Sequence, residues 1–347
     1  MSKFEHKLST KLFLDPAELS NIDRWHKPSS TWNKAALNVR QADPFCCLAS
    51  WQLSFHEAYS PRRRLLVKES SDSTIAFAEK VFSPHSIFLT PIESMWFFGN
   101  PLLGSNPVDL FDETLSDIEK LYSPISPKIM ISGIAPNGVL IQELKRKLNS
   151  KFNFSRHSSD FQCAASLAGD VDGFLSRRSG NHRRKLKKQI KRAAENGVYF
   201  ERYSPASDSQ VDEVYSRMLS IELASWKGSG KCGMAESRPK KFYNIMMKRL
   251  ALSKNARVIL ARHEGKDIGY IFGGMAGKVY RGQQFSFDDQ WRSSSIGNVL
   301  QFEQIKWLCE EGSTRYDMGP LNGHKMGYKR HWTEKKHRIE TWGLTKK

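Results

Sequence analysis

The sequence predicts a mixed α/β protein of two units, and three observations carry this prediction. Residues 257–287 contain three β segments, because runs rich in apolar and β-branched residues are separated by tight turns at 264–267 and at Gly277-Lys278. A polar turn with one glycine, residues 292–298, follows the third segment and opens an amphipathic helix. Strand-like and helix-like patterns also mix on both sides of residue 165, so we expect two α/β units, 1–165 and 166–347.

The first unit begins with a polar, irregular stretch, residues 1–40, which we expect to be at most a partly ordered lead-in. From Asp43 to about Phe161, short strand patterns mix with helical patterns. The expected strands are RRLLVKES, TIAFAEKVF and KIMISGI, and the expected helices are FHEAY, LFDETLSDIEKLY and GVLIQELKRKL.

The second unit begins near Val171. Its firmest element is the helix after Gly297, since apolar residues recur every three to four positions from Val299 to Cys309 and Gly312 follows as a C-cap. The other expected elements are a basic helix (177–195), the strand VYFERY, the helix QVDEVYSRMLSIELA, the loop SWKGSGKCG, the helix RPKKFYNIMMKRLALS, the three β segments, and the strands STRYDMG and HRIETWGL.

Composition narrows the functional classes. The chain has 54 Lys and Arg against 36 Asp and Glu, a net charge of +18, which favours acidic partners. Five cysteines without a CxxC spacing argue against a disulfide framework and a cysteine zinc site. The sequence shows neither a secretory signal nor an apolar run of membrane-spanning length, so we expect a cytoplasmic protein. The phosphate motifs GxGxxG and GxxxxGK[ST] are also absent from the sequence, which weakens kinase, ATPase and dehydrogenase interpretations.

The polar turn before the amphipathic helix is the first candidate binding site. A turn that opens a helix leaves backbone N–H groups unpaired, and these favour a phosphate or another anion. The candidate ligands of such an anion are Ser293, Ser294, Ser295, Gly297 and Asn298. Serines at this position also cap helices, and the two roles are compatible.

The order of three strands, an anion-binding turn, a helix and a strand is that of the GNAT acyltransferase fold. The C-terminal half resembles the acetyltransferase family that includes cellulose-synthesis-associated acyltransferases, whose members look like tandem GNAT-like halves, as do the Fem-type aminoacyl transferases. The matching stretches are DPFCCLASWQ, FLSRRSGNHRRKLKKQIKRAAENG, ELASWKG, KFY and YDMGPLNGHKMGYKRHW.

This resemblance implies an enzyme that moves an acyl group from a thioester to an amine without a metal. The implied donor is acyl-CoA or the phosphopantetheine of an acyl carrier protein. The usual phosphate turn of the fold has two glycines, whereas the turn here is serine-rich with Gly297 alone. The donor therefore stays open between coenzyme A, a carrier protein and an aminoacyl-tRNA.

Two stretches near the end of the chain are candidates for the catalytic groups. Asp317, at the end of a strand, is placed to act as a general base, or alternatively caps the next turn or pairs with Lys325 or Lys329. Tyr328 is a candidate acid for the leaving thiolate, and Lys329 a candidate ligand of a phosphate or carboxylate. The alternative is that Tyr328 anchors the core and Lys329 is solvated.

The glycine-containing loop after ELA is a candidate substrate-binding segment. Trp226 is expected to wall an acyl or side-chain pocket, and Lys227 to contact substrate. Glu222 is a second candidate base that would bind the acceptor amine. The alternative for all three is the packing of a helix end beside a surface loop.

The basic run 177–192 has nine Lys and Arg in sixteen residues, which is dense even for a solvated helix face. It suggests an acidic partner such as a carrier protein, with tRNA and a membrane as alternatives. Two rival functions follow: a Fem-like tRNA-dependent aminoacyl transferase, and a non-catalytic nucleic-acid- or membrane-binding protein on a GNAT scaffold. No heptad pair of the Fem coiled coil occurs in the sequence, so the N-acyltransferase is favoured.

Overall fold

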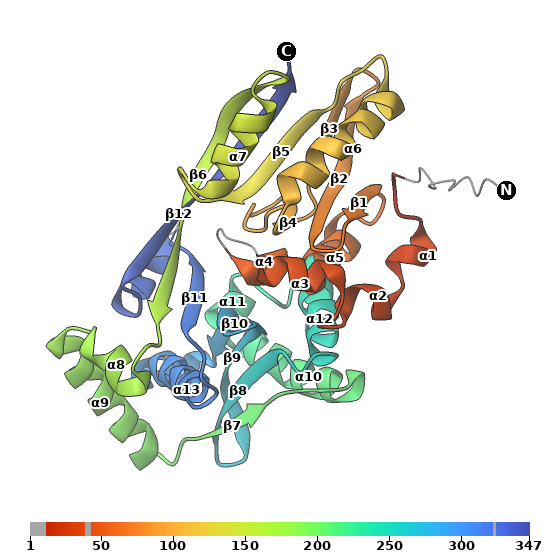
Figure 1. The fold of residues 1–347 in the computed structure, drawn as a ribbon. Coiled ribbons are helices and arrows are strands. Elements are labelled where there is room, and N and C mark those ends of the chain that lie inside the picture. The colour runs from red at the N-terminus through yellow and green to blue at the C-terminus, as the bar shows by residue number, and fades with distance from the viewer. Residues whose placement is uncertain (1–11, 39–42, 322–323) are drawn as a thin grey trace, which may run out of the picture.

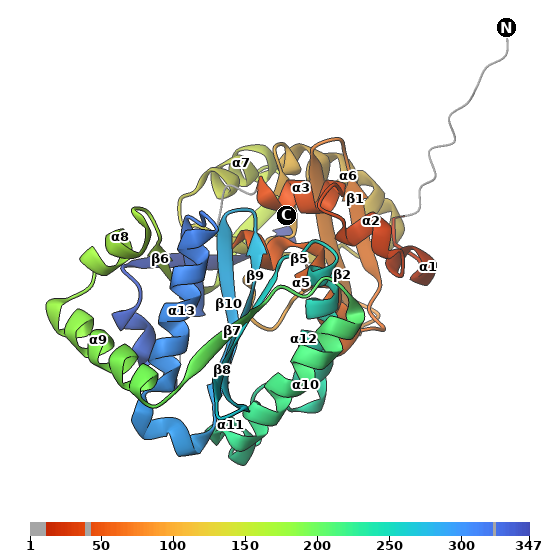
Figure 2. The same cartoon turned by 90° about the horizontal axis from the view of Figure 1, so that it is seen from below.

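The computed structural model describes residues 12–38, 43–321 and 324–347. These residues form one twelve-stranded mixed sheet with helices packed along it (Figures 1 and 2), so the predicted mixed α/β class is confirmed. The strand order is β1-β2-β3-β5-β12-β6-β11-β10-β9-β8-β7, and β4 pairs with β2.

The first half of the chain contains an antiparallel meander followed by a helix and a parallel strand. The strands β1, β2 and β3 pair antiparallel in sequence order, helix α6 follows, and β5 then pairs parallel to β3. The bounds are β1 Leu65–Glu69, β2 Ser73–Ser83, β3 Ser86–Pro91, β4 Leu102–Gly104, α6 Pro107–Tyr122, β5 Lys128–Ile134 and α7 Val139–Leu148.

The second half repeats this order. The predicted meander forms as β8, β9 and β10, the predicted helix follows as α13, and β11 pairs parallel to β10. Helix α13 buries its apolar positions against β8, β9 and β10, as the spacing of those positions required. The bounds are β8 Ala256–His263, β9 Lys266–Ala276, β10 Val279–Phe287, α13 Ile296–Glu310 and β11 Arg315–Pro320.

The two halves exchange their last strands. Strand β6 (Phe152–Ser166) leaves the first half and pairs with β11 of the second, while β12 (Lys335–Lys346) leaves the second half and pairs with β5 of the first. β6 and β12 also pair antiparallel with each other, from Lys335↔Ala164 to Lys346↔Phe152. The sheet is therefore continuous across residue 165, and each half is completed by a strand of the other.

The N-terminal region is more ordered than expected. Residues 16–37, which we expected to be irregular, form α1 Pro16–Leu19, α2 Ile22–His26 and α3 Thr31–Leu37. Trp25 and Trp32 of this region are completely buried and meet edge to face at 5.8 Å between ring centroids. Each helix is too short to show an apolar periodicity in the sequence. Each begins with a side-chain cap, at Asp15, Asn21 or Ser30, and such polar residues also occur in irregular segments.

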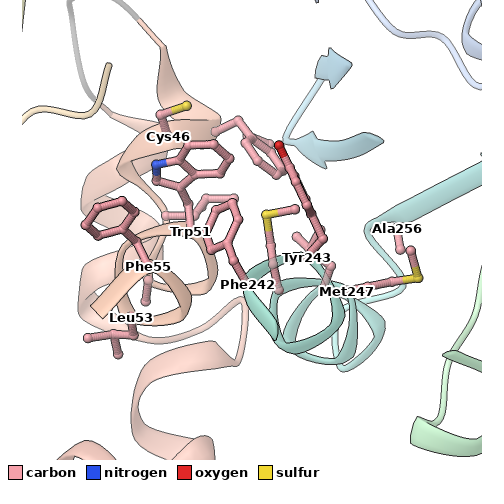
Figure 3. Packing of buried hydrophobic residues seen from close by; sticks show 14 of the residues in the cluster. Cys46, Trp51, Leu53, Phe55, Phe242, Tyr243, Met247 and Ala256 are labelled. Carbon is pink, nitrogen blue, oxygen red and sulfur yellow. The ribbon is translucent and has the colours of Figure 1, made fainter. Parts of the chain in front are cut away.

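The two halves also share an apolar core between α5 (Ala49–Tyr59) and α12 (Ser237–Ala251). Phe242 of α12 lies edge to face with Trp51 at 5.0 Å and with Phe55 at 6.3 Å between ring centroids (Figure 3). The remaining elements are α4 Pro44–Cys47, α8 Asp170–Ser176, α9 Gly180–Glu195, β7 Tyr199–Tyr203, α10 Asp208–Ala224, α11 Trp226–Ser229, and the 3-10 helices η1 Asp289–Ser294 and η2 His324–His331. Within the described ranges, the helices are all too short or too polar to cross a membrane.

Candidate functional site

The candidate site lies where β10 and β11 stop pairing. The two parallel strands are in register only from Val279↔Arg315 to Arg281↔Asp317. A bulge between Gly282 and Gln284 then bends β10, and β10 continues beside β9 alone. A cavity of about 320 Å³ occupies this opening.

The cavity is apolar with two cationic side chains. Aromatic and sulfur-containing residues dominate its wall, Lys227 and Lys329 are the charged members, and no Asp or Glu is among the described residues that line it. The lining residues are Trp226, Lys227, Ile271, Phe272, Gly282, Gln283, Gln284, Phe285, Ser286, Phe287, Gln301, Tyr316, Met318, Met326, Tyr328 and Lys329.

A second cavity, of about 170 Å³, lies at the start of α13 and shares part of its wall with the first. Ser295, Gly297 and Asn298 line it, together with Trp332 and with four residues of the first cavity, Phe285, Phe287, Gln301 and Tyr328. The helix begins after Ser295, whose backbone is left-handed with φ 57°, and no side chain of the described residues caps it. Its first backbone N–H groups therefore lack a side-chain cap among the described residues, and the N–H of Asn298 donates instead to the carbonyl oxygen of Ser295 at 3.0 Å.

Part of the polar turn lines a cavity and part of it does not. Ser295, Gly297 and Asn298 line the second cavity, whereas Ser293 and Ser294 lie in η1 and are outside the lining of both cavities. A Cβ added at Gly297 would lie 2.9 Å from Cε1 of Phe287, so the packing against β10 requires glycine at this position.

Tyr328 and Lys329 sit on η2, which closes the opening from the end of β11. Tyr328 lines both cavities, its ring meets Phe285 edge to face at 5.5 Å, and burial raises the pKa of its hydroxyl. Lys329 is 6% exposed, and its Nζ donates to the carbonyl oxygen of Pro320 at 2.7 Å. Burial, assisted by the positive charge of Arg281, lowers the pKa of Lys329 to about 8.

Trp226 and Lys227 lie on the short helix α11, which forms another side of the cavity. The Nζ of Lys227 donates to Oε1 of Gln284 and to the carbonyl oxygen of Phe285, each at 2.9 Å. Glu222 is fully buried behind this lysine, with 3.6 Å between the ionic atoms, and it accepts the hydroxyl hydrogen bond of Tyr270 at 2.7 Å. Glu222 is outside the lining of the cavity.

Asp317 lies one layer behind the cavity. Its neighbours Tyr316 and Met318 line the cavity, while Asp317 itself is fully buried and outside that lining, as alternation along a strand requires. It forms ion pairs with Arg315 and with Arg281, whose Nη1 is 3.4 Å from Oδ1 of Asp317. Burial and the adjacent negative charge of Asp43, which is itself 3.0 Å from Arg281, raise the pKa of Asp317.

The sequence interpretation missed several parts of this site. Gln301 and Met326 line the cavity but were not singled out, since Gln301 lies within a helical pattern and Met326 was passed over inside the matching stretch YDMGPLNGHKMGYKRHW. The pairing of Arg281 with Asp43 joins residues 238 positions apart, which no local pattern reveals. Among the described residues, no group of three His, Cys, Asp or Glu is arranged to hold a metal ion.

Residues 180–330 match the family model of the acetyltransferase (GNAT) domain. A conserved protein of unknown function from Bacteroides thetaiotaomicron VPI-5482 shares the fold, with 11% identity, 96% of this chain and 99% of that chain covered, and a TM-score of 0.61. FemX is similar with 10% identity, coverage of 89% and 94%, and a TM-score of 0.64. The C-terminal domain of a putative lysylphosphatidylglycerol synthetase from Agrobacterium fabrum is similar with 11% identity, coverage of 90% and 90%, and a TM-score of 0.56.

No curated protein matches the chain in sequence. At these identities the three structures establish a shared fold, and the family model supplies the assignment of the domain. The strands and helix of the matched region, β8 to β11 with α13, are those that open around the cavity. Residues 180–330 therefore carry an acetyltransferase (GNAT) domain, and the chain as a whole shares its fold with FemX.

Proposed function

We propose that the protein is an N-acyltransferase that moves an acyl group from an acyl thioester to an amine in the cavity between β10 and β11. The observation that carries this proposal is the pair of adjoining cavities, one at the start of α13 and one in the strand opening. Their shared wall of Phe285, Phe287, Gln301 and Tyr328 gives a donor and an acceptor one place to meet.

The donor arm enters along the start of α13 and lies against the bulged part of β10. Ser295, Gly297 and Asn298 line its path at the positive end of the α13 dipole, which attracts its anionic or amide portion. A backbone N–H of β10 beyond Gly282 meets the developing oxyanion. The amine nitrogen then attacks the carbonyl carbon, and the carbon–sulfur bond breaks. The amine proton leaves to water, and the hydroxyl of Tyr328 gives a proton to the thiolate.

Trp226 and Lys227 wall the acceptor part of this site. Glu222 and Asp317 act in the proposal as positioning residues rather than as the base in contact with the amine, because neither lines the cavity. Glu222 holds Lys227 and Tyr270, and Asp317 holds Arg281 at the point where the strands separate.

Acyl-CoA and an acyl carrier protein are the first candidate donors, and a tRNA-linked aminoacyl group is the second. The observation that favours a macromolecular donor is the position of α9 beside α13, whose start lines the second cavity (Figure 2). Nδ2 of Asn298 donates to Oε1 of Gln189, and Nη1 of Arg192 donates to the carbonyl oxygen of Ser293. The exposed cations of α9 are Arg183, Arg184, Lys185, Lys187, Lys188, Lys191 and Arg192.

The test is incubation of the full chain with acyl-CoAs, acyl carrier proteins and aminoacyl-tRNAs, each with a panel of amines. The proposal expects a new amide, detected by mass spectrometry, from one donor class. Gly297→Ala should lower donor affinity at least tenfold by closing the second cavity against Phe287, whereas Gly180→Ala should not, because a Cβ at Gly180 meets nothing within 4 Å. A product rate that is equal in the absence of protein for every donor would contradict the proposal.

A further inference from the structure

The charges around the first cavity do not balance. Behind the cavity, the buried Arg281 and the half-buried Arg315 are matched by the buried carboxylates Asp43 and Asp317. On the other side, Lys227 is matched by Glu222. In the part of the chain that the structure describes, these are all the carboxylates that form ion pairs with Arg281, Arg315 and Lys227.

Lys329 is left as the excess cation. Its ammonium group has three donors, and among the described residues one of them is used, by the carbonyl oxygen of Pro320. The side chain is 6% exposed and lines the cavity. A buried cation without a carboxylate partner is costly, and an anion that enters the cavity offsets this cost.

The rest of the wall specifies the body of the ligand. Phe272, Phe285, Met318 and Met326 surround the space with apolar surface. Gln283 supplies an amide, whose buried Nε2 has no hydrogen-bond partner among the described residues. A volume of about 320 Å³ is at the lower end of the range for ligand pockets, so the ligand is small.

We propose that the cavity binds a small carboxylate with an apolar body, such as an apolar amino acid, and that Lys329 is the residue that selects its charge. The inference rests on the proposed function in that the carboxylate belongs to one of the two substrates, the amine acceptor or the transferred acyl group. Lys227 contributes to the same electropositive wall, but its Nζ is already held by Gln284 and Phe285.

The experiment measures binding to the full chain by calorimetry, without any acyl donor. The probes are L-leucine and L-phenylalanine, their amides, and the dicarboxylates succinate and phenylsuccinate. Carboxylates should bind, and each amino-acid amide should bind at least tenfold more weakly than its acid, because the amide lacks the negative charge. Binding of the amino acids identifies the acceptor as the source of the carboxylate, and binding of the dicarboxylates alone identifies the acyl group.

Lys329→Met should weaken carboxylate binding at least tenfold, and Lys329→Arg should retain it. Lys336→Met, an exposed lysine of β12, is the matched control and should bind as the parent does. The inference is overturned if amides bind as tightly as acids, if no carboxylate binds, or if folded Lys329→Met binds as the parent does. Carboxylate binding without any amide product would instead retain this inference and contradict the proposed N-acyltransferase.

Discussion

Lys329 is the residue whose protonation should control ligand binding. Its pKa of about 8 lies below the ordinary value for lysine, so the ammonium is charged below pH 8 and loses its charge as pH rises through that value. Besides burial, Arg281, Cys163 and Asp317 are the groups that shift its pKa from the neighbouring strands. Arg281 disfavours the charged form, while Asp317 favours it.

We therefore expect carboxylate affinity to fall by up to about tenfold per pH unit above pH 8. The anion binds the protonated form of Lys329, and the population of that form falls tenfold per pH unit above its pKa. In Lys329→Arg the guanidinium stays charged, and affinity should remain level to pH 10. Calorimetry from pH 6 to 10 on both proteins measures this. A parallel decline in both proteins would assign the titration to another group.

A substitution at Asp317 distinguishes a general base from a carboxylate that stabilises the fold. Asp317→Asn removes a buried carboxylate that faces Arg281 and Arg315, and breaking a buried ion pair costs about 3 kcal/mol. Denaturant unfolding should show a loss of this order, whereas the exposed Asp172→Asn on α8 should change stability little. A variant of parental stability that has lost turnover would restore Asp317 as a general base.

At the scale of elements, local pattern predicted the second half better than the connection between halves. Strands β8 to β10 and helix α13 have an apolar periodicity that can be recognised in the sequence without tertiary context, and the turn at Gly277 separates β9 from β10. Strand β6 was not predicted, since residues 153–160 are polar and mostly exposed and owe their conformation to pairing with β12. A strand that depends on pairing with a segment distant in the sequence cannot be predicted from a window of ten residues.

The site shows the same division. Four residues that the sequence analysis proposed line the cavity: Trp226, Lys227, Tyr328 and Lys329. They were proposed because each lies in a segment that combines aromatic and basic residues with glycine. Asp317 was placed in a cleft by its position at a strand end, but the alternation of β11 turns it to the other face. That orientation depends on the register with Arg281, which only the sheet determines.

Helix α9 should bind a polyanion through its exposed face. Its buried residues Leu186 and Ala193 attach it to the domain, so its charges can be changed without disturbing the fold. Replacing Arg183, Arg184, Lys187 and Lys188 by Gln should weaken binding to an acyl carrier protein, tRNA or anionic vesicles at low salt.

The loss should shrink at high salt, and for a nucleic acid each missing phosphate contact lowers the salt slope by about 0.9. The matched control removes four exposed cations elsewhere, at Lys120, Lys145, Arg146 and Lys254. Equal weakening in both variants would show that net charge, rather than α9, attracts the partner. Fluorescence anisotropy with labelled tRNA and carrier protein, and vesicle co-sedimentation, measure the three partners.

For the whole molecule, the exchange of β6 and β12 makes the halves interdependent. A fragment of residues 1–165 keeps β6 but lacks both of its partners, β11 and β12, and leaves β5 with a bare edge. A fragment of residues 166–347 has the converse defect, because β12 loses β5 and β6 together. Both fragments also expose the apolar surface where Trp51 and Phe242 meet.

We therefore expect neither fragment to unfold cooperatively on its own, since unpaired edges and open cores favour aggregation over a folded state. Mixed during refolding, the two fragments should form a one-to-one complex with the circular dichroism of the intact chain. Size-exclusion chromatography and thermal melts of each fragment and of the mixture give the result. A cooperative melt of residues 166–347 alone would contradict this expectation, because it would mean that the acetyltransferase domain folds without the strand that it borrows.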